Sequence, residues 1–174
     1  MNDPSDPVLH PEARSAERRA LDRWADSALA DKLGPTFMVL GKLLRRRIRL
    51  ALAEAGLGLT AAQARAIVML HFHGPVSQQT LAALTDVEPS MLVSTLDVME
   101  REGLARRHRN PDDRRAYLVH LTTEGERRVP KLFALWDEVE AELVGDLTAE
   151  EQETLREQVL RLIGRLSPGE EPSG

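Results

Sequence analysis

Positively charged side chains gather in one short stretch near the middle of the chain. Five arginines lie within ten positions, namely Arg106, Arg107, Arg109, Arg114 and Arg115. Their charge is offset only by Asp112 and Asp113. A guanidinium stays charged at every physiological pH and donates several hydrogen bonds, so this cluster suits an anion such as phosphate. A solvated, arginine-rich turn without a partner is the alternative interpretation.

The residues around this cluster predict that a β-hairpin displays it. We expect strands at Ala105–Arg109 and Arg115–Leu121, joined by a turn over 110–113. Apolar residues alternate along one face of the second strand, at Tyr117, Val119 and Leu121. An arginine held out on such a wing can enter the narrow minor groove of DNA, where the negative potential is deepest. Asp113, two residues before Arg115, can brace that guanidinium through a bidentate pair. The arginines expected to contact DNA are Arg107, Arg109, Arg114 and Arg115.

A second candidate contact surface is a helix that ends just before the hairpin. We expect it over Pro89–Glu102, because proline favours the first helical turn and Gly103 can end a helix. Its core stripe is Leu92, Leu96 and Met99. The opposite face carries Ser90, Met91, Val93, Ser94 and Asp97. Hydroxyls can reach phosphates or base edges, and methyl-bearing side chains can pack on thymine. The free amides of Ser90 and Met91 would favour a phosphate. Each residue alone is equally consistent with ordinary surface.

Two shorter helices precede this one. Thr60 and Gln63 predict a capping box that begins the first, and Gly74-Pro75 ends it. Ser77 caps the second, whose buried residues would be Leu81, Ala82 and Leu84. Three short helices followed by a hairpin predict a winged helix-turn-helix, whose last helix lies in the major groove of DNA. We include Ser77 and Gln78, at the start of the middle helix, among the residues expected to contact DNA.

Longer helices are expected before this central segment. Pro11 can begin one that runs to about Ala30 and carries Trp24, and Gly34-Pro35 breaks the chain before another over about 35–55. The second has one apolar stripe, formed by Phe37, Leu40, Leu44 and Ile48. Its basic run over 42–49 is expected to be solvated or paired with the acidic C-terminal helices, with a DNA-backbone contact as the alternative.

Two further helices are expected after the hairpin. Thr123 and Glu126 predict a capping box for a helix to about Asp146, which Pro130 should kink. Thr148 and Glu151 predict another box for the last helix. The stripe of that helix is Leu155, Val159, Leu162 and Leu166. The chain is too short to cover these outer stripes, so we expect a second copy to cover them in a homodimer.

These elements define a mainly α fold with a small β-hairpin wing, in which a winged helix-turn-helix is joined to a helical dimerisation domain. We expect flexible ends over 1–9 and 167–174. Dimerisation helices are expected over 10–55 and 123–166, and the DNA-binding domain over 56–122.

Composition narrows the class of protein further. The 174 residues include no cysteine, which excludes a thiolate redox switch and a cysteine-ligated zinc site. Residues 137–174 hold eleven acids and three arginines, so the net charge of −5 leaves +3 on the rest of the chain, which can face phosphate. No apolar run reaches the ~20 residues of a membrane span. The first residues do not resemble a signal peptide, so we expect a cytoplasmic protein without a membrane partner.

Catalytic and metal-binding patterns are missing from the sequence. It has no G-x-S-x-G motif, no phosphate-cradling glycine loop and no paired acid and base in a catalytic context, so we expect no enzyme activity and no cofactor. His71 and His73 flank Phe72 without H-x-x-x-H spacing. A pocket wall or plain packing is therefore favoured over a metal site.

A resemblance to a known family is carried by residues 76–126, which read VSQQTLAALTDVEPSMLVSTLDVMEREGLARRHRNPDDRRAYLVHLTTEGE. This segment resembles regulators of the MarR family in its Pro-Ser, Met-Glu, Gly-Leu, Asp-Arg-Arg and Leu-Thr groups. The flanking helices match those of the family in number and order, so the resemblance covers about residues 35–166. The resemblance implies a homodimer on a pseudo-palindromic operator, usually repressing, that a small aromatic or anionic ligand releases. The family's Asp-x-Arg wing motif falls on Asp113 and Arg115, and its acidic residue before the reading helix falls on Glu88. Val93-Ser94 and Val98 depart from the polar or basic residues common there, which places more weight on the wing and on DNA shape.

The resemblance also suggests an effector site between the dimerisation helices and the wing domain, near Trp24, Arg65 and His71. The first helix is an extension found in some members, including urate-responsive ones, in which a tryptophan lies near the ligand. The acidic residue of those sensors is replaced by Arg65 here, which argues against urate. The alternative function is a winged helix that binds protein without reading DNA, for which an apolar or acidic wing would be expected.

Overall fold

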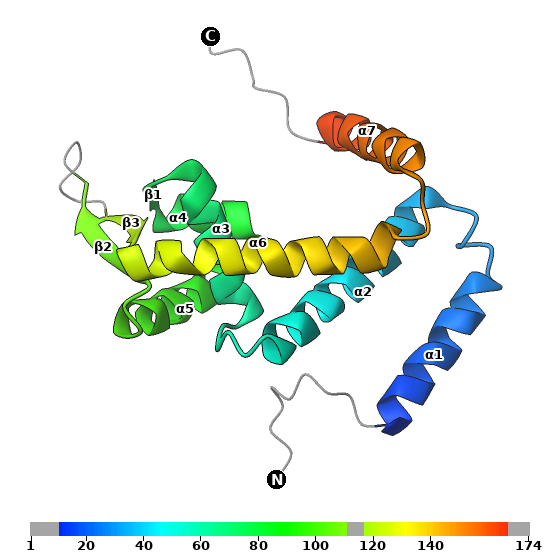
Figure 1. Ribbon diagram of the computed structural model, residues 1–174, viewed down its shortest axis with the longest axis horizontal. Helices are drawn as coiled ribbons and strands as arrows, with labels where there is room; N and C mark the ends of the chain where they lie inside the picture. The colour runs from blue at the N-terminus through cyan, green and yellow to red at the C-terminus, as the bar shows by residue number, and fades with distance from the viewer. Residues whose placement is uncertain (1–10, 111–116, 167–174) are drawn as a thin grey trace. The chain divides into compact units, whose positions relative to one another are not determined.

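The computed structural model describes residues 11–110 and 117–166, with side chains from Ser15 onward. Figure 1 labels the elements, which are α1 (Pro11–Ala25), α2 (Leu33–Glu54), α3 (Ala61–His73), β1 (Val76–Ser77), α4 (Gln78–Thr85), α5 (Pro89–Arg101), β2 (Ala105–Arg109), β3 (Tyr117–Leu121), α6 (Thr123–Val144) and α7 (Ala149–Leu166). The chain forms two compact units, and the boundary between them lies between Trp136 and Asp137, inside α6.

Local capping signals begin the short helices where the sequence predicts. Thr60 Oγ1 accepts from Gln63 N at 3.2 Å, and Gln63 Oε1 accepts from Thr60 N at 2.7 Å, which confirms the capping box of α3. Ser77 Oγ accepts from Thr80 N at 3.0 Å at the start of α4. Pro89 occupies the first turn of α5, where its missing N–H removes no helical hydrogen bond.

The first helix is shorter than expected. It ends at Ala25 instead of continuing to about Ala30. Trp24 O accepts both Ser27 N at 2.9 Å and Ser27 Oγ at 2.6 Å, so the bonding changes from i→i−4 to i→i−3. Such tight turns end an α-helix, and they fill the segment before α2.

The predicted cap of α6 is also wrong by one residue. Thr122, not Thr123, is the capping residue, because Thr122 Oγ1 accepts from Gly125 N at 3.1 Å and donates to Gly103 O. Glu126 therefore does not close a capping box with Thr123. The helix continues through Pro130 to Val144, and the kink expected at Pro130 stays a prediction.

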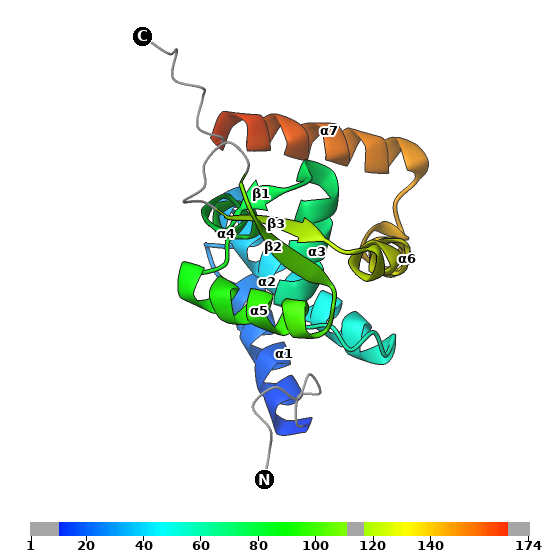
Figure 2. The same cartoon turned by 90° about the vertical axis from the view of Figure 1, so that its left-hand side faces the viewer.

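The β-sheet has one strand more than expected. Its antiparallel order is β1-β3-β2, so the short β1 pairs with the far side of β3, with Val76 opposite Val119 (Figure 2). Strand β2 spans Ala105–Arg109 as predicted, and Arg107 lies opposite Val119. The described part of β3 begins at Tyr117, and the predicted start at Arg115 lies outside the described residues.

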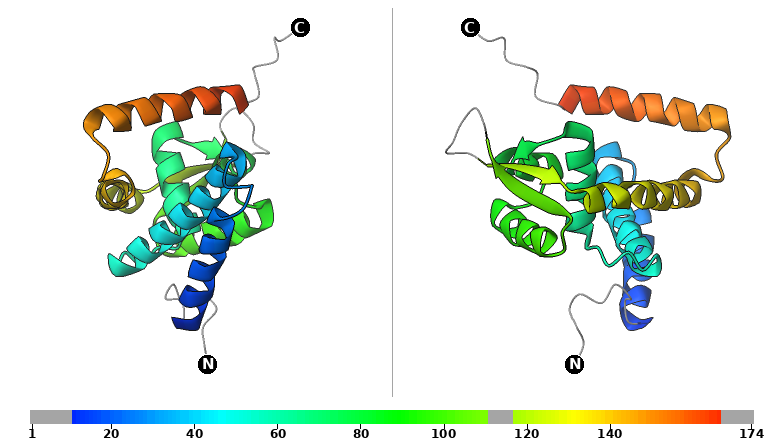
Figure 3. Two further views of the ribbon diagram at one scale, coloured as in Figure 1. Left: turned by 90° about the vertical axis from the view of Figure 1, so that its right-hand side faces the viewer. Right: turned by 60° about the vertical axis from the view of Figure 1, so that its left-hand side comes forward.

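The core of the first unit joins α3, α4 and α5 to the sheet. Its fully buried side chains include Ile67, Leu81, Leu92, Leu96, Met99 and Val119. Leu84 is only half-buried, contrary to the expectation, and the buried residue of that turn is Thr85, whose hydroxyl donates to Leu81 O at 2.7 Å. Helix α5 packs against β2, as the right-hand view of Figure 3 shows. This arrangement is a winged helix-turn-helix with additional helices, as predicted.

The second unit contains the end of α6, a short turn and α7. Thr148 N donates to Glu151 Oε2 at 2.8 Å, and Glu151 N donates to Thr148 Oγ1 at 3.3 Å, which confirms the capping box of α7. The turn is closed by Gln152 Nε2, which donates to Leu147 O at 3.0 Å. Of all the helices in the described ranges, none combines the length and the apolar composition needed to cross a membrane.

Candidate nucleic-acid interface

The start of α5 is capped by Glu88. Its carboxylate Oε2 accepts from Ser90 N at 2.6 Å and from Ser90 Oγ at 2.7 Å. The Ser90 hydroxyl bond, followed by the bond from the Ser90 amide, holds the pKa of Glu88 below its ordinary value. The sequence predicts a free Ser90 amide that would favour a phosphate, but in the structure this amide already donates to the Glu88 carboxylate. The contact of Ser90 with DNA stays a prediction.

Beyond the cap, α5 presents a mixed apolar and hydroxyl face to solvent. Met91 is 58% exposed and Val93 40% exposed, while Leu92 between them is fully buried. Ser94 Oγ donates to Met91 O at 2.8 Å, so its hydrogen is used and its lone pairs remain as acceptors. A face of this kind can pack on thymine methyls and accept from base amino groups.

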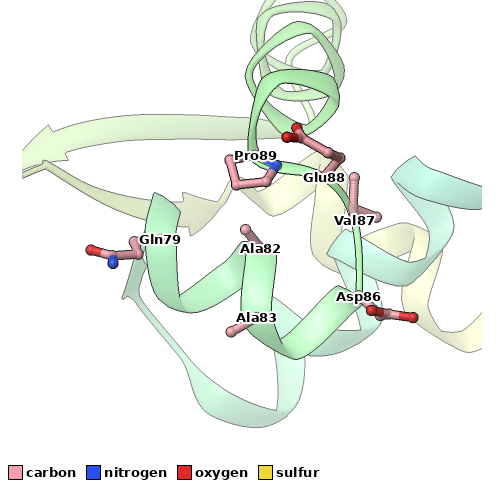
Figure 4. A pocket seen from close by; sticks show the side chains of 7 residues that line it. All are labelled: Gln79, Ala82, Ala83, Asp86, Val87, Glu88 and Pro89. Atoms are coloured by element: carbon pink, nitrogen blue, oxygen red, sulfur yellow. The ribbon is translucent and has the colours of Figure 1, made fainter.

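A shallow groove lies between α4 and α5, on the turn of the helix-turn-helix (Figure 4). It measures about 580 Å³ and is lined by Gln79, Ala82, Ala83, Asp86, Val87, Glu88 and Pro89. Asp86 makes the sharp turn that forms it, with a left-handed backbone at φ 49°. The lining carries two carboxylates and no cation, so the groove does not suit a phosphate.

Ser77 and Gln78 lie at the start of α4 and are half-buried. The Ser77 hydroxyl caps α4 by accepting from Thr80 N, and it also lies 2.8 Å from Thr80 Oγ1. Ser77 belongs to β1 as well, opposite Leu118. The structure thus gives Ser77 a structural role, and its predicted contact with DNA stays a prediction, as does that of Gln78.

The wing carries arginines in two different situations. Arg109 is exposed at the end of β2, opposite Tyr117, as a DNA contact would require. Arg107 is instead turned toward α5, where its Nη1 lies 2.7 Å from Asp97 Oδ1 and 2.6 Å from Glu100 Oε2. Two carboxylates of the same chain therefore already hold this guanidinium, and its predicted contact with DNA stays a prediction. Asp113, Arg114 and Arg115 lie outside the described residues.

Two histidines share one face of the wing. The rings of His108 and His120 meet edge to face, with centroids 4.9 Å apart. Burial, and next the neighbouring His108, lower the pKa of His120. Among the residues that the structure describes, no group of three or more possible metal ligands comes together.

The three residues assigned to an effector site are not joined in the structure. Trp24 lies on α1, whereas Arg65 and His71 lie six residues apart on α3, which places them on different faces of that helix. No described hydrogen bond or ring contact links Trp24 to either. His71 Nδ1 lies 2.9 Å from Glu126 Oε2, and its ring packs edge to face with Phe72 and Phe133.

Sequence reasoning missed two groups of interacting residues. One is the aromatic cluster of His71, Phe72 and Phe133 with Glu126, and the other is Arg107 with Asp97 and Glu100. The sequence does contain a signal for the group around Arg107, because Val93, Asp97 and Glu100 stand at i, i+4 and i+7 and so share one face of a helix. The arginine that meets this face comes from the neighbouring strand, and the helical pattern alone does not indicate it.

Comparisons with known proteins agree on one family. The MarR family model matches residues 57–116. The transcriptional regulator HosA of Escherichia coli O111:H- is 38% identical over 72 residues, which cover 41% of this chain and 53% of HosA. The match thus spans about half the length of that relative.

Solved structures extend the likeness over most of the chain. A structure described as a probable transcriptional regulator from Pseudomonas aeruginosa is 30% identical, with a TM-score of 0.62, and the match covers 77% of this chain and 98% of that one. Wild-type MarR from E. coli, in its apo form, is 27% identical, with a TM-score of 0.68, covering 75% and 95%. With this fold and these matches, the chain belongs to the MarR family of transcriptional regulators.

Proposed function

We propose that the chain binds DNA sequence-specifically as a homodimer, represses transcription from a pseudo-palindromic operator, and is released by a small aromatic or anionic ligand. The observation that carries the proposal is the exposed face of α5. Met91, Val93 and Ser94 point outward from a helix that Leu92 and Leu96 anchor in the core. A wing with exposed Arg106 and Arg109 packs against this same helix. This combination suits simultaneous contact with a major groove and the adjacent backbone.

The dimer is supported by apolar side chains that the chain leaves exposed. On α2, Leu33, Phe37, Met38 and Leu40 are exposed, and Met38 reaches 75%. On α7, the exposed residues are Leu155, Leu160, Ile163 and Leu166. Covering such residues in a second copy removes apolar surface from water. We accordingly assign 10–55 and 123–166 to dimerisation and 56–122 to DNA binding. A stable 19.4 kDa monomer at micromolar concentration in sedimentation would contradict the dimer.

The effector proposal is tested by Trp24→Ala and Arg65→Ala. If the ligand binds near these residues and His71, both variants should weaken its ability to release DNA while DNA binding without ligand is retained. An intact response in both variants would place the ligand elsewhere.

The experiment that tests the DNA-binding function is a gel shift with the DNA upstream of the chain's own gene. A scrambled duplex of equal length and composition is the control. We expect preferential binding to the upstream duplex that persists at physiological salt, because base contacts add to the salt-sensitive phosphate term. Equal binding to both duplexes, or none, would contradict sequence-specific recognition and favour the protein-binding alternative.

A further inference from the structure

The outer edge of the wing is attached to α5 through Arg107, by its backbone amide and by its side chain. Strand β2 lies at the edge of the sheet, so alternate backbone amides of this strand face away from β3. Arg107 N is one of them, and it donates to Glu100 Oε1 on α5 at 2.8 Å. A carboxylate from the helix thus provides the hydrogen-bond partner that a further strand would otherwise supply.

The guanidinium of Arg107 strengthens this attachment. Nη1 bonds Asp97 and Glu100 at 2.7 and 2.6 Å, and Nη2 approaches Val93 O at 3.4 Å. These partners occupy three successive turns of one face of α5. The Arg107 side chain is only 21% exposed, although Asp97 is 54% exposed. The geometry therefore constrains both the rotation of α5 about its axis and the distance between α5 and the wing.

The same contacts organise charge on the surface that would face DNA. Asp97 follows the outward residues Val93 and Ser94 along α5, where an unpaired carboxylate would repel phosphate. The half-buried Arg107 guanidinium offsets this charge and that of Glu100. Its Nε is buried and has no hydrogen-bond partner, so the contacts made by Nη1 and Nη2 set the position of the group.

We propose that Arg107 is a positioning residue for DNA reading: it holds α5 and the wing as one unit, so that the helix meets base edges when the wing meets the backbone. The inference rests on the proposed DNA-binding function. A positioning role can be told apart from the expected phosphate contact of Arg107. Loss of a positioning residue should reduce specificity, whereas loss of a phosphate contact should reduce affinity for every DNA sequence.

The test compares two duplexes and two arginines. One duplex is selected by the wild-type chain from a randomised pool, and the other is a scrambled duplex of the same length. Arg107→Gln should lower affinity for the selected duplex on the order of tenfold, with little change for the scrambled one. The matched control is Arg106→Gln, which removes the same charge from the adjacent position of β2 and should lower both affinities alike. Equal loss on both duplexes for Arg107→Gln would overturn the proposal in favour of a phosphate contact or of partial unfolding.

A double-mutant cycle then assigns the effect to the contact with α5. Glu100→Ala removes the partner of the Arg107 amide and one of the partners of the guanidinium. If Arg107 acts through α5, Arg107→Gln should cost markedly less affinity for the selected duplex in the Glu100→Ala background than in the wild type. Additive losses would contradict the positioning role. Arg107→Lys should restore at most part of the specificity, since one ammonium cannot match the planar guanidinium fork, and complete restoration would also overturn the proposal.

A measurement without DNA keeps the inference separate from the proposed function. If the wild-type chain selects no duplex, the DNA-binding proposal fails. Hydrogen exchange in the full-length protein then still decides whether the contact between Arg107 and Glu100 holds the wing to α5. Glu100→Ala should accelerate exchange of the Arg107 amide and of neighbouring β2 amides, while α3 amides are unchanged. Unchanged exchange at Arg107 would show that the contact does not hold the wing.

Discussion

Gly125 lies directly against the backbone of Leu104. A Cβ at Gly125 would stand 2.1 Å from the carbonyl oxygen of Leu104 and 3.1 Å from Cδ2 of Leu121. The same carbonyl accepts from Thr122 N at 3.0 Å. The segment that leads into β2 and the first turn of α6 therefore meet backbone to backbone, and any side chain at position 125 would separate them.

Gly125→Ala should destabilise the protein by about 2–3 kcal/mol, because the atom opposite is a fixed carbonyl oxygen and not a flexible side chain. Thermal or denaturant unfolding measures the change. The control is Gly164→Ala in α7, where a Cβ meets nothing within 4 Å. That substitution should be neutral or slightly stabilising, since alanine is the better helix former. A stability loss at position 164 as large as that at position 125 would contradict the steric explanation.

Replacing the cap of α5 should strengthen DNA binding. Glu88→Ser keeps a good capping residue but removes the carboxylate that now occupies the Ser90 amide. A phosphate can then approach the helix start, and we expect affinity to rise on the order of threefold, with thermal stability unchanged. Asp86→Asn removes the same charge from the same turn without touching the cap, so it should change affinity less. A lower affinity for Glu88→Ser would show that Glu88 itself contacts DNA favourably.

The wing tip is tested by two substitutions whose residues lie outside the described structure. Arg115→Ala should weaken operator binding by about 1–3 kcal/mol if its guanidinium enters the minor groove. The slope of log affinity against log salt should fall by about one, as one fewer counterion is released.

Asp113→Ala should also weaken operator binding, although it removes a negative charge, if Asp113 holds Arg115 in position. Tighter binding by Asp113→Ala in the same titration would mean that the wing tip acts only as diffuse charge.

Wing stability should decrease on mild acidification. The pKa of His120 in the folded protein lies below its ordinary value of 6.5, so the folded state disfavours protonation. The stabilising contribution of neutral His120 is complete above pH 6.5 and is lost as pH falls from 6.5 through the lower folded value. The midpoint temperature of thermal unfolding should therefore change less in His120→Gln than in the wild type when the pH is lowered from about 7.5 to below 6.5. The exposed His73→Gln serves as the control, and if both variants behave like the wild type, His120 does not contribute.

Much of this fold follows from short stretches of sequence, because the decisive interactions are local. The pairs Thr60 with Gln63 and Thr148 with Glu151 lie three residues apart, and their caps form as predicted. The buried face of α5, with Leu92, Leu96 and Met99, likewise follows from helical spacing alone. The outward face of that helix, which carries the proposed DNA contacts, is determined by the same pattern.

The tertiary structure decides where local signals are equivalent or partners are distant. Thr122 and Thr123 are chemically identical candidates for the cap of α6, and Thr122 caps it because its hydroxyl also reaches Gly103 O. The charge of Arg107 is evident from the sequence, whereas its direction depends on carboxylates seven and ten residues away on a packed helix. Composition and periodicity thus predict which residues have the chemistry to bind DNA, and packing between elements decides which of them already have a partner within the chain.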